Sequence, residues 1–145
     1  MKVFVEIPGE PFALQRGRAR VVGGKYARVY DPKANTTWKG TAGQWMLAAR
    51  NLAGALAFTG PVSLRITALF ACPKTDERVK TPRPERWSKA KKDVDNIAKA
   101  VGDAGNGILW LDDRQVVSLI VTKRIAAQGE PARVLVEVEE LEGEG

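Results

Sequence analysis

The stretch KKDVDNIAKAVGDAGNGILWLDDR, residues 91–114, concentrates acidic side chains in an otherwise basic chain. The chain has 145 residues and a formal net charge of +6. The stretch holds five of its seven aspartates: Asp93, Asp95, Asp103, Asp112 and Asp113. Carboxylates grouped in this way bind hard divalent cations, and nearby lysines and arginines attract phosphates. The stretch therefore predicts a metal-assisted site that acts on a polyanion.

A helix is expected to begin near Asp95. It has one apolar stripe, formed by Ile97, Ala100, Val101 and Ala104. Asp95 and Asn96 are both suitable N-caps for it. Side chains two positions apart point the same way only in extended backbone, so Asp93 must be extended if it shares a site with Asp95. Asp113 must then return beside the pair at the start of the next strand.

The same acids also have a purely structural interpretation. Lys99 lies four residues after Asp95 and four residues before Asp103, a spacing that suits ion pairs on a helix. Asp112 and Asp113 could form a polar turn and nothing more. In this interpretation the aspartates only cap and pair, and for the helix residues taken alone it is the favoured one. The second aspartate pair, which follows a glycine-rich turn just before a strand, favours a shared site instead.

Composition excludes several kinds of site. The chain has no histidine, and Cys72 is its only cysteine, which rules out a serine–histidine relay, an intramolecular disulfide and the usual nitrogen and sulfur zinc site. The longest apolar run, residues 52–58, is far shorter than the roughly 20 residues of a membrane span, and no signal segment opens the chain. We expect a cytoplasmic protein, not bound to a membrane, whose metal chemistry uses oxygen ligands.

Periodicity along the chain predicts one α+β or α/β domain, residues 1–145, with a small mixed β-sheet packed against two main helices. Strands are expected over residues 2–7, 62–72, 115–124 and 132–141, together with a hairpin over residues 19–30 that turns at Gly23-Gly24. The second helix is expected over residues 41–57, with a core stripe of Trp45, Ala48, Ala49, Leu52 and Leu56. Cys72 is expected to be a small buried hydrophobe.

Basic residues gather in residues 16–39 and again in residues 74–92. Residues 73–92 contain three prolines and few apolar residues, so we expect a mobile basic loop that orders on DNA, with Trp87 free to stack on an unpaired base. A solvated surface without a ligand is the alternative. The acidic C-terminus, residues 140–145, is expected to be frayed. The expected DNA contacts are Arg16, Arg18, Arg20, Arg86, Lys89, Lys91 and Lys92.

Two motifs together resemble a known family. DVDNIAKAVGDAGNG followed by LWLDDRQVV resembles the signature of the RusA family of Holliday junction resolvases. In that family an Asp-x-Asp-Asn-x-x-Lys helix start is followed, after about fifteen residues, by an Asp-Asp-x-Gln-Val strand. The resemblance is close over residues 91–117, and the strand from Val62 is similar to that of many phage-type members.

The resemblance implies a small dimeric endonuclease that binds four-way DNA junctions and resolves them by paired nicks. It implies Mg²⁺, or Mn²⁺ in its place, held by Asp93, Asp95 and Asp113, with Lys99 as an essential base or phosphate contact. Supporting roles around these residues are expected for Asn96, Asp103 and Asp112. The alternative is a branched-DNA-binding module without catalysis, whose acidic cluster is structural.

Overall fold

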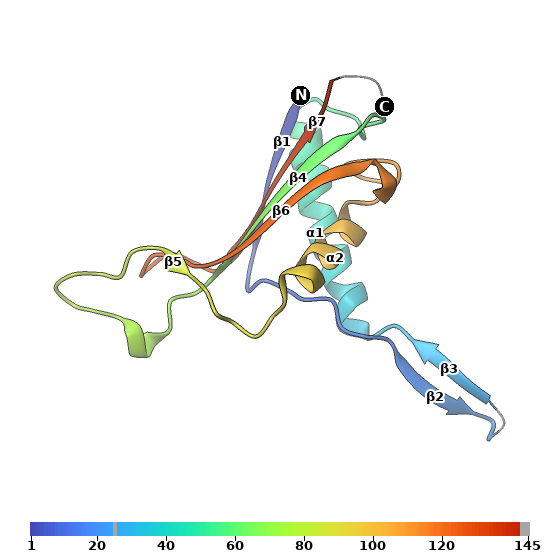
Figure 1. Cartoon of the computed structure of the whole chain (residues 1–145), viewed down its shortest axis with the longest axis horizontal. Coiled ribbons are helices and arrows are strands. Elements are labelled where there is room, and N and C mark those ends of the chain that lie inside the picture. The colour runs from blue at the N-terminus through green and yellow to red at the C-terminus, as the bar shows by residue number, and fades with distance from the viewer. Residues whose placement is uncertain (25, 143–145) are drawn as a thin grey trace.

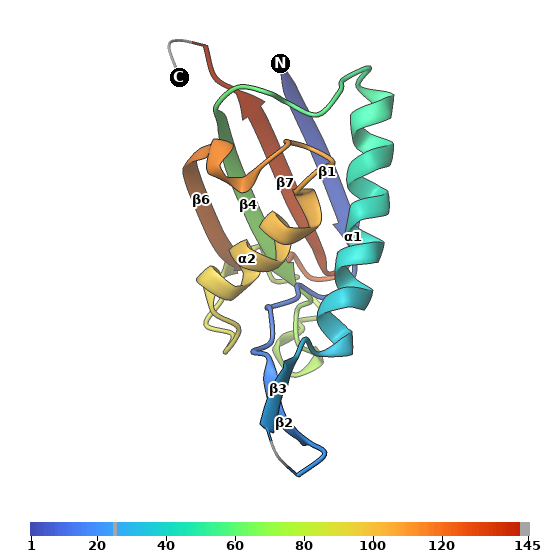
Figure 2. The ribbon, with the colours of Figure 1, turned by 90° about the vertical axis from the view of Figure 1, so that its right-hand side faces the viewer.

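Two helices cover one face of a five-stranded sheet in the computed structural model, which describes residues 1–24 and 26–142 (Figures 1 and 2). In spatial order the strands are β1 (Lys2–Pro8), β7 (Arg133–Glu140), β4 (Val62–Phe70), β6 (Val116–Ile125) and β5 (Arg86–Trp87). Strands β4 and β6 are parallel, and the other neighbours are antiparallel. The predicted mixed sheet with two main helices is therefore confirmed.

The helices are α1 (Lys33–Leu52) and α2 (Val94–Gly105), and two short 3-10 turns, η1 (Lys74–Asp76) and η2 (Asp113–Gln115), lie in the connections. Strands β2 (Arg18–Val22) and β3 (Tyr26–Tyr30) form the predicted hairpin as a separate two-stranded sheet. Figure 1 shows this hairpin and the segment that carries η1 and β5 extending away from the main sheet in different directions.

The core lies between the helices and one face of β1, β7 and β4. Apolar residues meet in rows across these strands: Val3 pairs with Val138, which pairs with Leu64, and Val5 pairs with Val136, which pairs with Ile66. All of these side chains are buried. The period-2 alternation of the sequence thus produces one continuous apolar face. The helices contribute Ala42, Met46, Ile97, Val101 and Ala104 to the same core.

Helix α1 differs from the predicted helix over residues 41–57. It begins at Lys33 and ends at Leu52, where Gly54, with φ +69°, reverses the chain. The predicted stripe is wrong, because Trp45 is 46% exposed and Leu52 92% exposed. The buried side is formed instead by Asn35, Ala42, Gly43 and Met46, and a Cβ added to Gly43 would lie 3.2 Å from Cδ1 of Ile108. The close approach at Gly43 favours a small side chain at that position, while Trp45 and Leu52 stay exposed.

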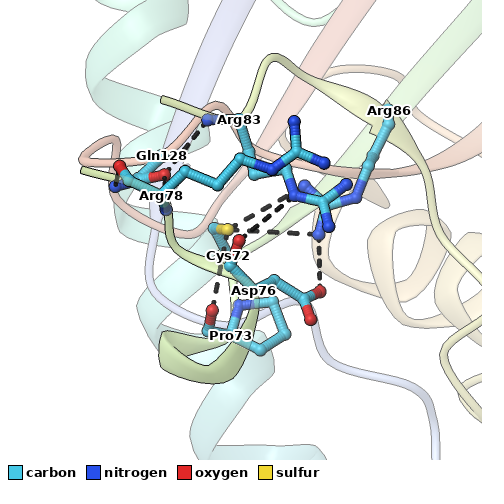
Figure 3. A network of polar contacts seen from close by, with 7 residues as sticks. All are labelled: Cys72, Pro73, Asp76, Arg78, Arg83, Arg86 and Gln128. Atoms are coloured by element: carbon cyan, nitrogen blue, oxygen red, sulfur yellow. Dashed lines mark hydrogen bonds and ion pairs between the residues drawn. The ribbon is translucent and has the colours of Figure 1, made fainter. Parts of the chain in front are cut away.

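The basic segment of residues 73–92 contains η1 and β5 and is attached to the body by polar contacts (Figure 3). The Gln128 side chain accepts hydrogen bonds from the backbone N–H of Arg78 and of Arg83, at 2.9 and 3.0 Å. Its Nε2 donates to the Arg78 carbonyl at 2.9 Å. The mobility predicted for this segment stays a prediction.

The end of strand β4 and the C-terminal segment differ in detail from the expectations. Strand β4 ends at Phe70, and Cys72 beyond it is half-buried, with an Arg86 nitrogen 3.8 Å from its sulfur (Figure 3). The expectation that Cys72 is a buried strand residue is therefore wrong. Glu140, the first residue of the acidic C-terminus, belongs to β7, and residues 143–145 lie outside the described residues.

Candidate acidic active site

Asp93 and Asp95 lie together at the start of α2. Asp93 is the N-cap residue, in extended conformation with φ −75° and ψ 143°, as predicted. The helix begins at Val94, so Asp95 lies in its first turn, and the prediction that Asp95 or Asn96 is the N-cap is wrong. Both aspartates are exposed. The helix dipole favours negative charge at this end.

In the described part of the chain, Asp93 does not cap the helix with its side chain, and Asp95 forms no ion pair with Lys99. The Asp93 side chain makes no capping hydrogen bond. In the described part of the chain, no ion pair joins Lys99 to Asp95 or to Asp103, although all three are exposed on α2. Two carboxylates and an ammonium one turn away are therefore available to a ligand. Asn96 is half-buried, and its carbonyl accepts from the Leu14 backbone N–H at 2.9 Å.

The second acidic pair forms a capped turn. The Asp112 carboxylate accepts a hydrogen bond from the Arg114 backbone N–H at 3.0 Å, so Asp112 caps η2. This N–H holds the pKa of Asp112 below its usual value, and the neighbouring Asp113 side chain adds to the shift. Asp113, the first residue of η2, is exposed. The structure thus agrees with Asp112 as the turn residue of the pair.

Strand β6 separates the two acidic pairs. At one end, Nζ of Lys123 lies 2.9 Å from the Lys92 carbonyl, next to Asp93. At the other end, η2 directly precedes Val116. The seven residue steps from Val116 to Lys123 span about 23 Å of extended strand. Asp113 therefore lies at the opposite end of β6 from Asp93 and Asp95.

The three aspartates consequently do not meet within one chain. Among the described residues, no group of three or more aspartate, glutamate, histidine or cysteine side chains is placed to hold a metal ion. The expectation that Asp113 returns beside Asp93 is wrong for a single chain. The reason is α2, whose 12 residues, about 18 Å long, carry the chain from one end of β6 towards the other. The metal-binding roles themselves stay predictions.

The chain matches the family model described as Endodeoxyribonuclease RusA over residues 8–139. It belongs to the RusA family. It is also 34% identical over 121 residues to the uncharacterized protein YqaN of Bacillus subtilis (strain 168), with 79% of this chain and 82% of that protein covered. Membership confirms the resemblance read from the two acidic motifs, and it implies an endonuclease.

Two polar residues of this RusA family member hold the acidic segments, and both were missed as site residues from sequence. Lys123 donates to the carbonyls of Ala90 and Lys92, at 2.6 and 2.9 Å, just before Asp93. The Gln115 side chain forms hydrogen bonds with backbone groups of Asp112, beside Asp113, and of Phe58. A signal was present for Lys123: it interrupts the apolar alternation of its strand, opposite Ala68.

The predicted DNA contacts fall into three groups. Arg16, Lys89 and Lys91 are exposed. Two others have protein partners: Arg86 pairs with Asp76 at 2.7 Å, and Lys92 donates to the Pro11 carbonyl at 2.6 Å. Arg18 and Arg20 lie on β2, but their side chains are outside the described part of the structure.

Neither described helix is long and apolar enough to cross a membrane.

Proposed function

We propose that this protein is a metal-dependent, structure-selective endodeoxyribonuclease that resolves Holliday junctions by paired nicks, in DNA recombination and repair. The observation that carries the proposal is the exposed pair Asp93 and Asp95 at the start of α2, where the described residues show no capping bond on Asp93 and no ion pair to Lys99. The structural alternative needs those contacts. Family membership supplies the reaction class.

The donor set of the pair suits Mg²⁺. This ion prefers oxygen ligands, keeps several waters, and is commonly held by one or two carboxylates together with a substrate phosphate. Asp93 and Asp95 would hold it, and Mn²⁺ would substitute. A bound ion of this kind polarises a phosphate and lowers the pKa of a bound water. Lys99, one turn along α2, would contact a phosphate oxygen and stabilise negative charge in the transition state.

A homodimer would complete the site. Strand β5 pairs with Ile125 and Arg124, and Ser88 after it donates to the Lys123 carbonyl, so among the described residues the β6 edge from Val116 to Thr122 has no strand neighbour. This edge carries apolar side chains that are 61%, 50% and 44% exposed in Val117, Leu119 and Ile120. Antiparallel pairing of two such edges would place Asp113 of the partner subunit near Asp93 and Asp95.

Exposed bases would hold the junction arms. Arg16, before the hairpin, and Lys89 and Lys91, before α2, are exposed and lie in the two basic regions of the chain. Contacts of this kind with phosphates give affinity without sequence preference and weaken steeply as salt rises. The basic surface would therefore bind branched DNA through its backbone, while the acidic pair selects the bond to be cut.

The test is incubation of purified protein with a synthetic four-way junction and Mg²⁺. Paired nicks at symmetric positions are expected, with little cutting of linear duplex and no cutting in chelator. Asp95→Asn should bind the junction as tightly as the parent and cut it far more slowly. Equal cutting rates for Asp95→Asn and the parent would refute the proposal, as would tight junction binding with no nicking under Mg²⁺ or Mn²⁺.

A further inference from the structure

We propose that Gln115 is a positioning residue that fixes the turn carrying Asp113, through an amide group whose hydrogen bonds connect that turn to the main sheet. The inference rests on the proposed function and adds to it a residue that acts on the reaction through Asp113.

Each end of the Gln115 amide is used twice. Its Oε1 accepts from the backbone N–H of Leu111, at 2.9 Å, and of Asp112, at 2.8 Å. Its Nε2 donates to the carbonyl of Phe58, at 2.7 Å, and of Gly60, at 2.9 Å. An amide side chain offers two donors and one acceptor oxygen with two lone pairs, so every bond it can make is made here. The residue is half-buried.

The segment on the far side of the amide is itself held to the sheet. Oε2 of Glu140, at the end of β7, accepts from the backbone N–H of Thr59 at 3.2 Å and of Gly60 at 3.0 Å. The Phe58 N–H donates to the Leu109 carbonyl at 2.9 Å. Gln115 therefore joins the Asp112-Asp113 turn to residues 58–60, and Glu140 joins residues 58–60 to β7.

Asp113 needs such support because its position lies on an exposed turn. Among the described residues, the turn's other side-chain contacts are local: the Asp112 carboxylate accepts from the Arg114 backbone N–H and pairs with the Arg114 guanidinium. A carboxylate that binds a metal must be held within a fraction of an ångström of its productive place, and groups that hold ligands are worth about 10- to 100-fold in metal affinity or activity. Two bonds of Gln115 hold the backbone of the turn at Leu111 and Asp112, and the other two connect it to Phe58 and Gly60, which are distant in sequence.

The experiment compares Gln115→Met with Gln128→Met. Gln128 is a matched control, because its amide also bridges backbone groups, those of Arg78 and Arg83, but away from the acidic turn (Figure 3). Three quantities are measured for each variant and the parent: the single-turnover nicking rate on a four-way junction, the Mg²⁺ concentration that gives half of this rate, and junction affinity in chelator. Thermal midpoints show how far each variant is destabilised.

Gln115→Met should slow nicking and raise the Mg²⁺ requirement, by about 10- to 100-fold in their combined effect, with junction affinity unchanged. Gln128→Met should leave the rate and the Mg²⁺ requirement unchanged, even where its thermal midpoint falls as much. Equal losses in the two variants, or a Gln115→Met protein with the parent's Mg²⁺ requirement, would overturn the inference.

If Gln115→Met does not fold, Gln115→Asn replaces it, because Asn keeps the amide but is one methylene too short for both pairs of bonds. The same shift in Mg²⁺ requirement is expected, and its absence would count against the positioning role. Failure of the parent itself to nick would instead refute the proposed function, and the inference with it. The two failures are therefore distinguishable.

Discussion

Trp110 packs directly against Gly105, so closely that a Cβ atom added to Gly105 would lie 2.7 Å from Cη2 of the indole ring. Trp110 is completely buried and is the largest such side chain in the described part of the protein. Gly105 is the last residue of α2, and its carbonyl accepts from the Leu109 N–H at 2.8 Å. This contact sets the path by which the chain leaves the helix and reaches the Asp112-Asp113 turn.

Gly105→Ala should therefore destabilise the protein. The added methyl group must displace a buried ring, and overpacking of this kind costs about 1–3 kcal/mol. Gly102 is the control on the same helix, since nothing lies within 4 Å of a Cβ added there. Gly102→Ala should stabilise by about 0.5–1 kcal/mol, because alanine favours helix. Urea unfolding of the two variants and the parent checks both signs, and equal midpoints would contradict the packing argument.

The two aspartates of the turn should respond differently to loss of charge. Asp113→Asn should lower the nicking rate at saturating junction by at least about 100-fold, more than the loss expected for a supporting residue. Asp112→Asn should be milder, because asparagine is also a good N-cap and its oxygen can still accept the Arg114 N–H. Single-turnover rates for the two variants decide the order, and a larger loss in Asp112→Asn would reverse the assignment.

Mixing two inactive variants tests whether the site is shared between subunits. Asp95→Asn and Asp113→Asn proteins should each be inactive alone. In a mixed dimer, one site would combine the intact Asp95 of one subunit with the intact Asp113 of the other, so nicking of one strand should return after subunit exchange. Sites formed within single chains would give no recovery. The measurement is nicking after co-refolding, with each variant refolded alone as its control.

Substitutions of Lys123 and Lys89 should have different effects, because Lys123 supports the site and Lys89 is proposed to contact DNA. Lys123→Met removes the ammonium group that donates hydrogen bonds to the Ala90 and Lys92 carbonyls. It should lower the free energy of unfolding by about 1–3 kcal/mol. Lys89 is exposed, so Lys89→Met should leave stability unchanged. It should instead weaken junction binding and reduce the slope of log affinity against log salt by about 1. Unfolding curves and salt titrations distinguish the two, and the opposite pattern would contradict these roles.

Local patterns predicted much of the fold. The alternation of Val3, Val5 and Ile7 predicted strand β1 and its buried face, and the spacing of Ile97 and Val101 predicted the buried stripe of α2. These predictions succeed because side chains repeat on one face every two residues in a strand and every 3.6 residues in a helix, so the apolar spacing in the sequence gives the buried face. The face of α1 failed this test: the helix packs against β1 and α2, and the side that meets them carries Gly43 and Met46 rather than Trp45.

The sequence by itself determined the acidic motifs, their family and the extended conformation at Asp93. Only the tertiary structure decided that Asp113 lies at the far end of β6 from Asp93, and that Lys123 and Gln115 hold the two acidic segments. Motif spacing counts residues along the chain, but it does not give the direction in which α2 carries them. That direction depends on the packing of α2 against the sheet, which residues distant in sequence create together.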